Sequence, residues 1–516
     1  MMPTQNDRRI AGRIIVAATA IRLFVAATLP LGIDESYAAV VSRRLSLSYF
    51  DHPPAVFWLA HAAAALGGES PLALRWPFVL LFALTCRFLF RLTARLFSTR
   101  AGVWAVLAAQ LIPVFSLSSG SWVLPDGPLL CASVTAALAL SYAVPVTGPV
   151  DGDPIARSAR WSDWLTLGLA LGLAGLSKYH AALLGAGIVA FLATDALGRR
   201  WLTRPQPYVA VVIAAACVIP VFLWNAQHDW ISFRFQSGRA AGHGNPITAL
   251  LQNIAGQAGY ILPWFWVPLM VLLFRGVRAG TRDRATWFCC WLGVLPVTVF
   301  TLASLGGRAG LPHWPAPGFF MLLPLLGAAI ARWETRAPVI SHRRIFTAGV
   351  VYALLLVIVV THAATGWVAR VVPALHRADP AFELLEYRTL RDTLAARGFL
   401  APARFVATTD WIRGAKIGYA LGPVRPVLVL NDDARHFPFT VDIPPLLGSD
   451  GVMLMRLARD ESEVEMWIAA QPYLALFDTL RFEGRVPVLR GADTALTVAV
   501  FRAKHLRHAW TPARTQ

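Results

Sequence analysis

The run YVAVVIAAACVIPVFLWNA occupies residues 208–226 and contains no charged side chain. A helix of this length rises about 1.5 Å per residue and is close to the roughly 30 Å thickness of the hydrocarbon core of a bilayer. Similar runs recur between residues 12 and 365. They indicate helices that span a membrane, because a helix satisfies its own backbone hydrogen bonds and can expose apolar side chains to lipid.

Runs of this kind, closed by arginines or by proline and glycine clusters, predict about eleven spans. They cover residues 12–32, 72–97, 101–119, 125–145, 163–176, 180–197, 208–226, 258–274, 286–304, 317–331 and 345–365. The first run follows Arg8, Arg9 and Arg13, as a signal peptide would. We expect it to stay as an uncleaved anchor, because it is long and no convincing small-residue cleavage site follows it.

The composition also indicates a membrane protein. Of the 516 residues, 56% are hydrophobic and 15% are charged, whereas about 25% of residues are charged in soluble proteins. This excludes an ordinary soluble enzyme and a disordered chain. In a soluble protein the net charge of +18 would suggest nucleic acid, but here basic residues mark the sides of the membrane, and we predict no nucleic-acid partner.

The cysteines lie within apolar runs and show neither the spacing of a disulfide framework nor that of a zinc site. They are Cys86, Cys131, Cys217, Cys289 and Cys290. We expect them to be small side chains that face lipid or the protein core.

The loop charges predict how the chain lies in the membrane. The N-terminus and every second segment between the predicted spans together hold 20 arginines. The loops on the other side of the membrane hold seven basic residues. Positive charge collects in cytoplasmic loops. The N-terminus is therefore predicted to be cytoplasmic, and an odd number of spans places everything after residue 365 on the external side.

The composition changes near residue 366. Residues 366–516 hold 19 basic and 16 acidic side chains, with short β-rich runs at 425–430 and 495–501. Residues 379–397 predict an amphipathic helix after an Asp-Pro start, and Asn431-Asp432-Asp433 is a turn signal that ends a strand. We predict a transmembrane domain over 1–365 and a small soluble α/β domain over 366–516.

Two acids follow the first span: Asp34 and Glu35 stand in the first external loop, and Asp51-His52-Pro53-Pro54 comes shortly after. Carboxylates at a membrane boundary are costly unless they face water, bind a cation or serve a reaction, and we treat Asp34 and Glu35 as candidate catalytic residues. They can also simply cap the next helix. A divalent metal beside Asp34 and Glu35 is possible, but no ligand cluster indicates one, and no cofactor is expected. The two prolines predict a rigid, extended turn.

Further polar side chains gather in the other external loops, and we treat them, with Asp51 and His52, as candidate substrate-binding residues. They are Asp126, Lys178, Tyr179, His228, Arg234, Arg239 and His313. Lys178 is the only lysine of the membrane portion. It can snorkel to the interface, but contact with a lipid phosphate explains a cation there better.

Taken in order, these motifs resemble the integral-membrane glycosyltransferases of the GT-C class, which use polyprenyl-phosphate sugars and include protein O-mannosyltransferases and the lipid A aminoarabinose transferase. The resemblance rests on Asp34-Glu35, Asp51-His52-Pro53-Pro54, Pro125-Asp126, the 175–179 segment, the aromatic 230–236 stretch and His313-Trp314-Pro315. It implies that Asp34 is the essential carboxylate and that Lys178, with Arg234 or Arg239, holds the carrier phosphate. One departure concerns Asp51-His52, which replaces the acid-lysine pair of the aminoarabinose enzymes.

The resemblance implies a polytopic helical protein of the bacterial inner membrane with a periplasmic C-terminal domain. It implies inverting transfer of a sugar from a polyprenyl (undecaprenyl) monophosphate to an envelope lipid, glycan or protein. The residues suit this chemistry, because the phosphate is already a good leaving group and one carboxylate base and some cations suffice. Two alternatives stay open: a transporter that uses the same intramembrane charges, and a non-catalytic envelope assembly protein in which Asp34 is dispensable.

Overall fold

The structure, a computed structural model, describes residues 5–147, 160–239, 242–372, 379–457, 461–491 and 493–510. The chain divides into two compact units. The first comprises Met1–Ala26, Ser46–Leu59 and Arg75–Ala353, and the second comprises Ala27–Leu45, Ala60–Leu74 and Leu354–Gln516. The second unit thus combines two short N-terminal segments with the C-terminal part of the chain.

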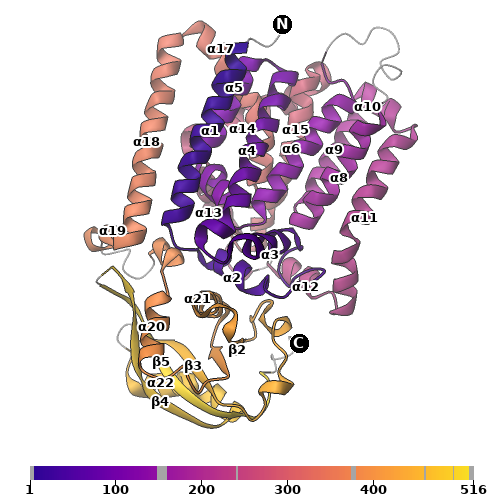
Figure 1. The fold of residues 1–516 in the computed structure, drawn as a ribbon. Coiled ribbons are helices and arrows are strands. Elements are labelled where there is room, and N and C mark those ends of the chain that lie inside the picture. Colours follow the sequence, from indigo (N-terminus) through magenta and orange to yellow (C-terminus); the bar gives the residue numbers. More distant parts are fainter. Residues whose placement is uncertain are drawn as a thin grey trace. The chain divides into compact units, whose positions relative to one another are not determined.

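The first unit is helical (Figure 1). It contains α1 (Gln5–Thr28), α5 (Thr99–Leu111), η1 (Val114–Ser119), α6 (Asp126–Ala143), α8 (Trp161–Ser177), α9 (Ala181–Thr194), α10 (Ala196–Trp201), α11 (Pro205–Gln227), α12 (Ile231–Gly238), α13 (Pro246–Ile261), α14 (Pro263–Ala279), α15 (Arg284–Ala303), α16 (Ala316–Met321) and α17 (Leu323–Arg336). Three further helices are divided between the two units, namely α3 (Ala55–Gly67), α4 (Pro71–Leu96) and α18 (Pro338–Thr365), and the last two residues of α1 also belong to the second unit.

Every predicted apolar run coincides with helix. Among the described residues, six helices are long and apolar enough to cross a membrane, or up to seven if a bent pair is one span. Other runs are broken, as at 101–119, where α5 ends near Pro113 and a π-helical turn follows. Proline interrupts a helix because it lacks an N–H donor. The helical fold is confirmed, and the number of eleven crossings stays a prediction.

One predicted span needs correction. The run 258–274 is not one helix, because α13 ends at Ile261 and α14 begins at Pro263, with an angle of 111° between them. Leu262 between them has φ +72°. Pro263 explains the break, because proline disfavours helical backbone in the residue before it. The whole of α13 before residue 258 was missed by the hydropathy reading.

Small residues allow close packing of α8 on α11, which lie side by side in Figure 1. A Cβ on Gly172 would lie 2.4 Å from the Cβ of Cys217, and one on Gly168 would lie 2.6 Å from the carbonyl oxygen of Ala210. Small side chains at such positions let helices approach closely in a membrane. All five cysteines are free thiols, four of them buried, in agreement with their predicted role as packing residues.

The second unit contains a five-stranded sheet in the order β2-β1-β3-β5-β4. The strands are β1 (Phe405–Thr408), β2 (Val427–Val429), β3 (Gly451–Leu457), β4 (Phe477–Arg490) and β5 (Asp493–Leu506). β1 pairs in parallel with β2 and β3, and β5 pairs antiparallel with β3 and β4. The predicted strands at 425–430 and 495–501 are β2 and part of β5.

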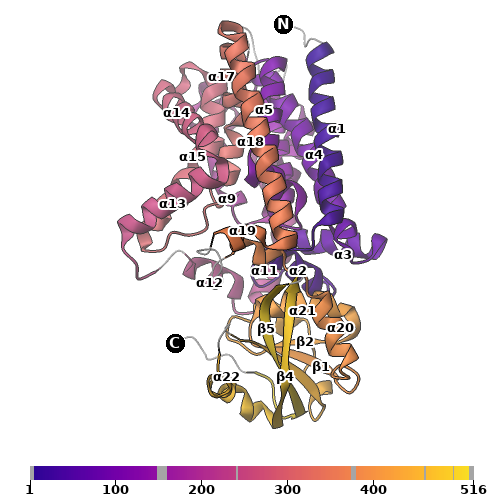
Figure 2. The ribbon, with the colours of Figure 1, turned by 90° about the vertical axis from the view of Figure 1, so that its left-hand side faces the viewer.

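Helices cover both faces of this sheet (Figure 2). Leu390 of α20 (Arg388–Ala396) and Ile417 of α21 (Trp411–Leu421) pack on one face, with Val406 and Val452. On the other face, α22 (Glu463–Ala470) contributes Met466. Successive residues of a strand point to opposite faces, so strands such as β1 and β3 contribute to both cores.

The predicted helix over 379–397 is wrong as a single element. A 3₁₀ turn, η5 (Pro380–Leu384), precedes α20, and Leu385 between them is extended. The carboxylate of Glu386 accepts hydrogen bonds from the backbone N–H groups of Tyr387 and Arg388 at 3.0 and 3.2 Å. The side chain thereby satisfies donors at the start of a new helix, which favours a break there.

The predicted turn after the 425–430 strand is confirmed. Asn431 Oδ1 accepts from the backbone N–H of Asp433 at 2.8 Å directly after β2. Asparagine commonly closes a turn in this way.

The helix that carries the two predicted catalytic acids belongs to the second unit. α2 (Ile33–Val41) packs on α21, and its residues from Glu35 to Val41 are all buried. Asp34, in the first turn, is exposed.

Candidate functional site

A buried ion pair lies at the centre of the candidate site in the first unit. Lys178 Nζ donates to both carboxylate oxygens of Asp126, each at 2.9 Å. Asp126 begins α6 and Lys178 follows the last residue of α8, so the pair joins two helix ends. The two side chains are 5% and 11% exposed. Burial this deep makes each charge depend on the other, since an unpaired buried charge is strongly unfavourable.

Imidazoles from other loops surround this pair. Burial lowers the pKa of His52 to about 4, and the charges of Lys178 and Arg239 act in the same direction while Asp51 and Asp126 oppose them. The same holds for His313, whose pKa is lowered to about 4 first by burial and then by the charge of Lys178. Both rings are therefore neutral at pH 7, and each offers one N–H donor and one acceptor.

Two of the ring nitrogens are left without a partner. His52 Nδ1 and His180 Nε2 are buried and make no hydrogen bond to any residue that the structure describes. His180 stacks on Phe300, with ring centroids 4.4 Å apart. Buried polar atoms normally have hydrogen-bond partners, so these two nitrogens are free to bind a polar ligand.

The Asp51-His52-Pro53-Pro54 turn is held by α12. Gln236 Nε2 donates to the Asp51 carbonyl at 2.5 Å, and Ser232 Oγ donates to the Tyr49 carbonyl at 3.1 Å. The Asp51 carboxylate lies 3.9 Å from His52 Nε2. These two hydrogen bonds from α12 hold the backbone on which Asp51 and His52 stand.

The two candidate arginines differ. Arg239 lies over the rings of Phe235 and Trp314, at 5.5 and 5.1 Å, and is close enough for its charge to lower the pKa of His52 and His313. Arg234 is exposed on α12. The structure thus brings Arg239 near His52 and His313 and leaves Arg234 at the surface.

The remaining candidates of this unit have separate places. Tyr179 packs on Phe233, with centroids 5.2 Å apart, and burial raises the pKa of its hydroxyl. His228 Nδ1 lies 2.7 Å from the carbonyl of Trp224, and the two rings stack at 4.1 Å. His228 is thus engaged with its own helix end.

The first-loop acids lie in the second unit and are not equivalent. Glu35 is 1% exposed, and its Oε2 accepts from the backbone N–H of the N-cap residue Gly32 at 2.7 Å, so that Glu35 caps the start of α2. This is the capping role that the sequence allowed. Asp34 is the exposed acid of the pair. Within the described residues, no three His, Cys, Asp or Glu side chains are placed to hold a metal ion.

Sequence reasoning placed His180, Ser232 and Gln236 among the polar residues of the external loops but did not select them as site residues. His180 could have been found, because it follows Lys178 and Tyr179 directly. Gln236 and Ser232 carried no such signal, since their role is to bond backbone carbonyls far away in the sequence.

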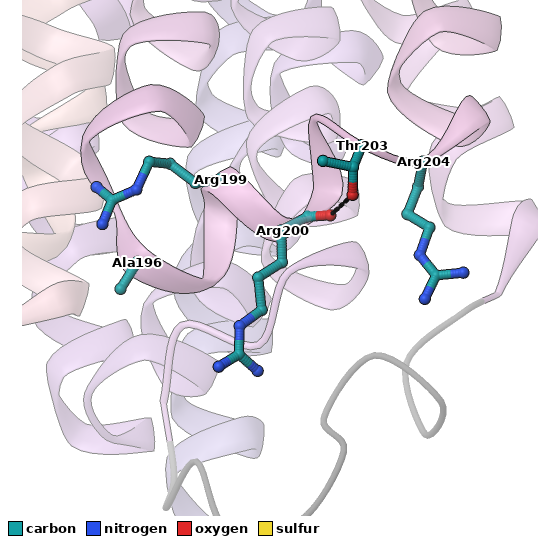
Figure 3. Close-up of a pocket in the computed structure, with 5 residues that line it drawn as sticks. All are labelled: Ala196, Arg199, Arg200, Thr203 and Arg204. Atoms are coloured by element: carbon teal, nitrogen blue, oxygen red, sulfur yellow. Dashed lines mark hydrogen bonds between the residues drawn. The ribbon is translucent and has the colours of Figure 1, made fainter.

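A basic surface pocket is remote from this cluster. It has a volume of about 480 Å³ and is lined by Ala196, Arg199, Arg200, Thr203 and Arg204 (Figure 3). It lies on α10 and the start of α11, at the opposite end of the first unit from α12 (Figure 1). These arginines belong to the segments predicted to be cytoplasmic.

Part of this region is similar in sequence to a known family. Residues 51–224, which include Asp51, His52, Asp126 and Lys178, match the family described as dolichyl-phosphate-mannose-protein mannosyltransferase. Along almost the whole chain, the fold matches the crystal structure of ArnT from Cupriavidus metallidurans bound to undecaprenyl phosphate. That match has a TM-score of 0.62 and 17% identity, and covers 95% of this chain and 97% of ArnT. The predicted resemblance to the GT-C glycosyltransferases is confirmed.

Two curated glycosyltransferases are also similar in sequence. Lipid A galacturonosyltransferase RgtD from Rhizobium johnstonii is 25% identical over 307 residues, which are 58% of this chain and 60% of RgtD. The undecaprenyl phosphate-alpha-4-amino-4-deoxy-L-arabinose arabinosyl transferase 2 of Proteus mirabilis is 26% identical over 311 residues, or 57% of this chain and 52% of that protein. The match thus spans about half to three fifths of each relative.

Proposed function

We propose that this chain is an inverting glycosyltransferase that moves a sugar from polyprenyl (undecaprenyl) monophosphate to a hydroxyl group of an envelope lipid, glycan or protein. One observation carries the proposal. The buried Lys178–Asp126 pair, whose charges act on the neutral rings of His52 and His313 together with that of Arg239, lies in the segment that matches the mannosyltransferase family.

The charges of this cluster suit a phosphate that leaves. The donor phosphodiester carries one negative charge, and the released monoester gains another as the bond to the sugar breaks. Asp126 already compensates Lys178, so Arg239 supplies the additional positive charge. Donors that are in place before the charge develops stabilise the transition state without reorganisation.

The histidines add hydrogen bonds without adding charge. The unpartnered nitrogens of His52 and His180 can donate to phosphate oxygens or accept from sugar hydroxyls. A neutral imidazole can do either, depending on its tautomer. Such contacts orient the donor sugar, and orientation contributes a large share of catalysis.

The acceptor hydroxyl needs a base, and Asp34 is the proposed one. It is exposed in the first turn of α2, whereas its neighbour Glu35 is used as a cap. A single in-line displacement, in which Asp34 takes the hydroxyl proton and the carrier phosphate leaves from the opposite face of the sugar, inverts the anomeric carbon. No metal-dependent step is needed.

The reaction is placed at the external face of a bacterial inner membrane. The loop charges support this placement, with a cytoplasmic N-terminus and a periplasmic C-terminal domain. The arginine pocket on α10 and the α12 helix that holds Asp51 lie at opposite ends of the first unit, as expected if the two ends face different compartments.

The test is a lipid-linked sugar profile of cells that lack this protein. The unused polyprenyl-phosphate sugar should accumulate, and its mass identifies the sugar. Plasmid-borne wild-type protein should restore the profile, whereas an Asp34→Asn variant should not. An unchanged profile in the deletion strain, at normal expression in the parent strain, would refute the proposal.

A further inference from the structure

The C-terminal domain holds the helix that carries Asp34. Tyr37 of α2 packs edge-on against Trp411 of α21 at 5.6 Å, and its hydroxyl accepts from the backbone N–H of His436 at 3.1 Å. Further along, Gly418 of α21 lies so close to Val40 that an added Cβ would be 3.2 Å from it. The α2 helix therefore packs on the C-terminal domain along most of its length.

A buried lysine bonds the turn that opens α2. Lys416 of α21 is 4% exposed, and its Nζ donates to the carbonyl oxygens of Leu31 at 2.6 Å and Glu383 at 3.3 Å. Leu31 directly precedes Gly32, whose N–H is bound by Glu35. Lys416 and Glu35 thus fix two consecutive residues of this turn, one through its carbonyl and one through its N–H.

The surroundings of Lys416 explain why a cation is buried here. Glu383 is exposed, but partial desolvation of its carboxyl raises its pKa, the charge of Glu35 acts in the same direction, and Lys416 opposes both. Two neighbouring carboxylates, of which Glu35 is buried, repel unless a cation lies between or beside them. Removal of the lysine would leave the Glu35 cap next to an uncompensated acid.

We infer that Lys416 is a positioning residue of the transferase: it fixes the turn at Leu31 and Gly32 and so sets the direction in which the Asp34 side chain projects from α2. The inference rests on the proposed function. It gives the C-terminal domain a part in the reaction, because the domain supplies a contact without which the base is misplaced. A misplacement of about 1 Å can cost roughly 10²-fold in rate.

The experiment uses the full-length protein with its donor and acceptor, and compares three variants. Lys416→Met removes the charge and keeps the length of the side chain. Lys416→Arg keeps the charge and can still donate to a carbonyl. Lys504→Met is the matched control, because Lys504 is the other lysine of this domain and is exposed on β5.

We expect Lys416→Met to lower kcat by about 10- to 100-fold while KM for the donor changes by less than about twofold. Lys416→Arg should recover most of the rate, and Lys504→Met should behave as wild type. Hydrogen exchange of the backbone amides of residues 31–37 should increase in Lys416→Met and not in Lys504→Met, because the turn loses its carbonyl contact.

A double variant separates this inference from the proposed function. If Lys416 acts through Asp34, the Asp34→Asn, Lys416→Met protein should be no slower than Asp34→Asn alone. Normal transfer by Asp34→Asn would refute the proposed base and leave the exchange result to test the turn. Unchanged kcat and unchanged exchange in a folded Lys416→Met protein would overturn the inference, as would a defect confined to KM.

Discussion

Lys178 Nζ lies 2.9 Å from both carboxylate oxygens of Asp126, in a place where both side chains are almost fully buried. The position of Lys178 in the sequence suggested an isolated cation that binds a phosphate, but the structure pairs it with Asp126. It is half of a neutral pair, and a donor phosphate would share its ammonium with Asp126.

The first prediction separates the stability of this pair from its function. Lys178→Met should destabilise the protein by about 3–5 kcal/mol, because Asp126 is left as an unpaired buried charge. Adding Asp126→Leu should restore most of the stability, since well-packed apolar pairs often replace buried ion pairs without loss. Thermal unfolding in detergent measures both effects. If the pair binds the donor, the stable double variant should still fail to transfer sugar, whereas Lys178→Arg should retain partial activity.

Arg239 and Arg234 form a matched pair for the second prediction. Arg239→Gln should raise KM for the donor by about tenfold or more, because a hydrogen bond to a charged group contributes about 1.5–3 kcal/mol. Arg234→Gln should leave it nearly unchanged, since Arg234 is exposed and away from the histidine cluster. Steady-state kinetics with purified protein gives both KM values. Equal effects of the two substitutions would contradict the prediction that Arg239, and not Arg234, binds the donor.

The third prediction concerns the proposed base. Asp34→Asn should lower turnover by about 10² to 10⁴-fold, the usual contribution of a positioned general base, while donor binding persists. Glu35→Gln should be milder, because glutamine keeps an oxygen that can accept from the Gly32 N–H. Single-turnover transfer assays measure the chemical step. Loss of transfer in Glu35→Gln alone would exchange the roles of the two acids.

Stability should fall at mildly acidic pH. The pKa of His52 and of His313 is lowered to about 4 in the folded protein, so between pH 4 and 6.5 the unfolded chain binds more protons than the folded one. The free energy of unfolding therefore falls as pH drops through this window, by up to about 1.4 kcal/mol per pH unit for each histidine, and is unaffected by these groups above about pH 7. The midpoint of thermal unfolding across pH 5–8 tests this. His52→Gln with His313→Gln should flatten the profile.

The fifth prediction is the side of the membrane on which the C-terminal domain lies. A reporter that is active only in the cytoplasm, fused after Gln516, should be silent, while the same reporter fused to the N-terminus should be active. A bright C-terminal fusion of full-length protein would reverse the topology and move the proposed reaction to the cytoplasmic face.

Much of the fold followed from local patterns. Runs such as 208–226 could be recognised as helices because a lipid-facing segment must be apolar and must satisfy its own hydrogen bonds, and both are properties of consecutive residues. Strand β2 and the Asn431 turn could also be predicted, because each depends on a short run of consecutive residues. The break at Leu262 and the two-part 379–397 segment were missed, because a proline and one side-chain cap outweighed the periodicity there.

The sequence by itself determined which residue types could do the chemistry: Lys178 stood out as a cation in an apolar region, and Asp34 and Glu35 as acids at its edge. Only the tertiary structure decided their partners. Asp126 lies 52 residues from Lys178, and Lys416 lies 385 residues from Leu31. Such pairs depend on how helices pack rather than on local spacing. The same packing leaves Asp34 exposed and buries Glu35, although the two acids are neighbours in the chain.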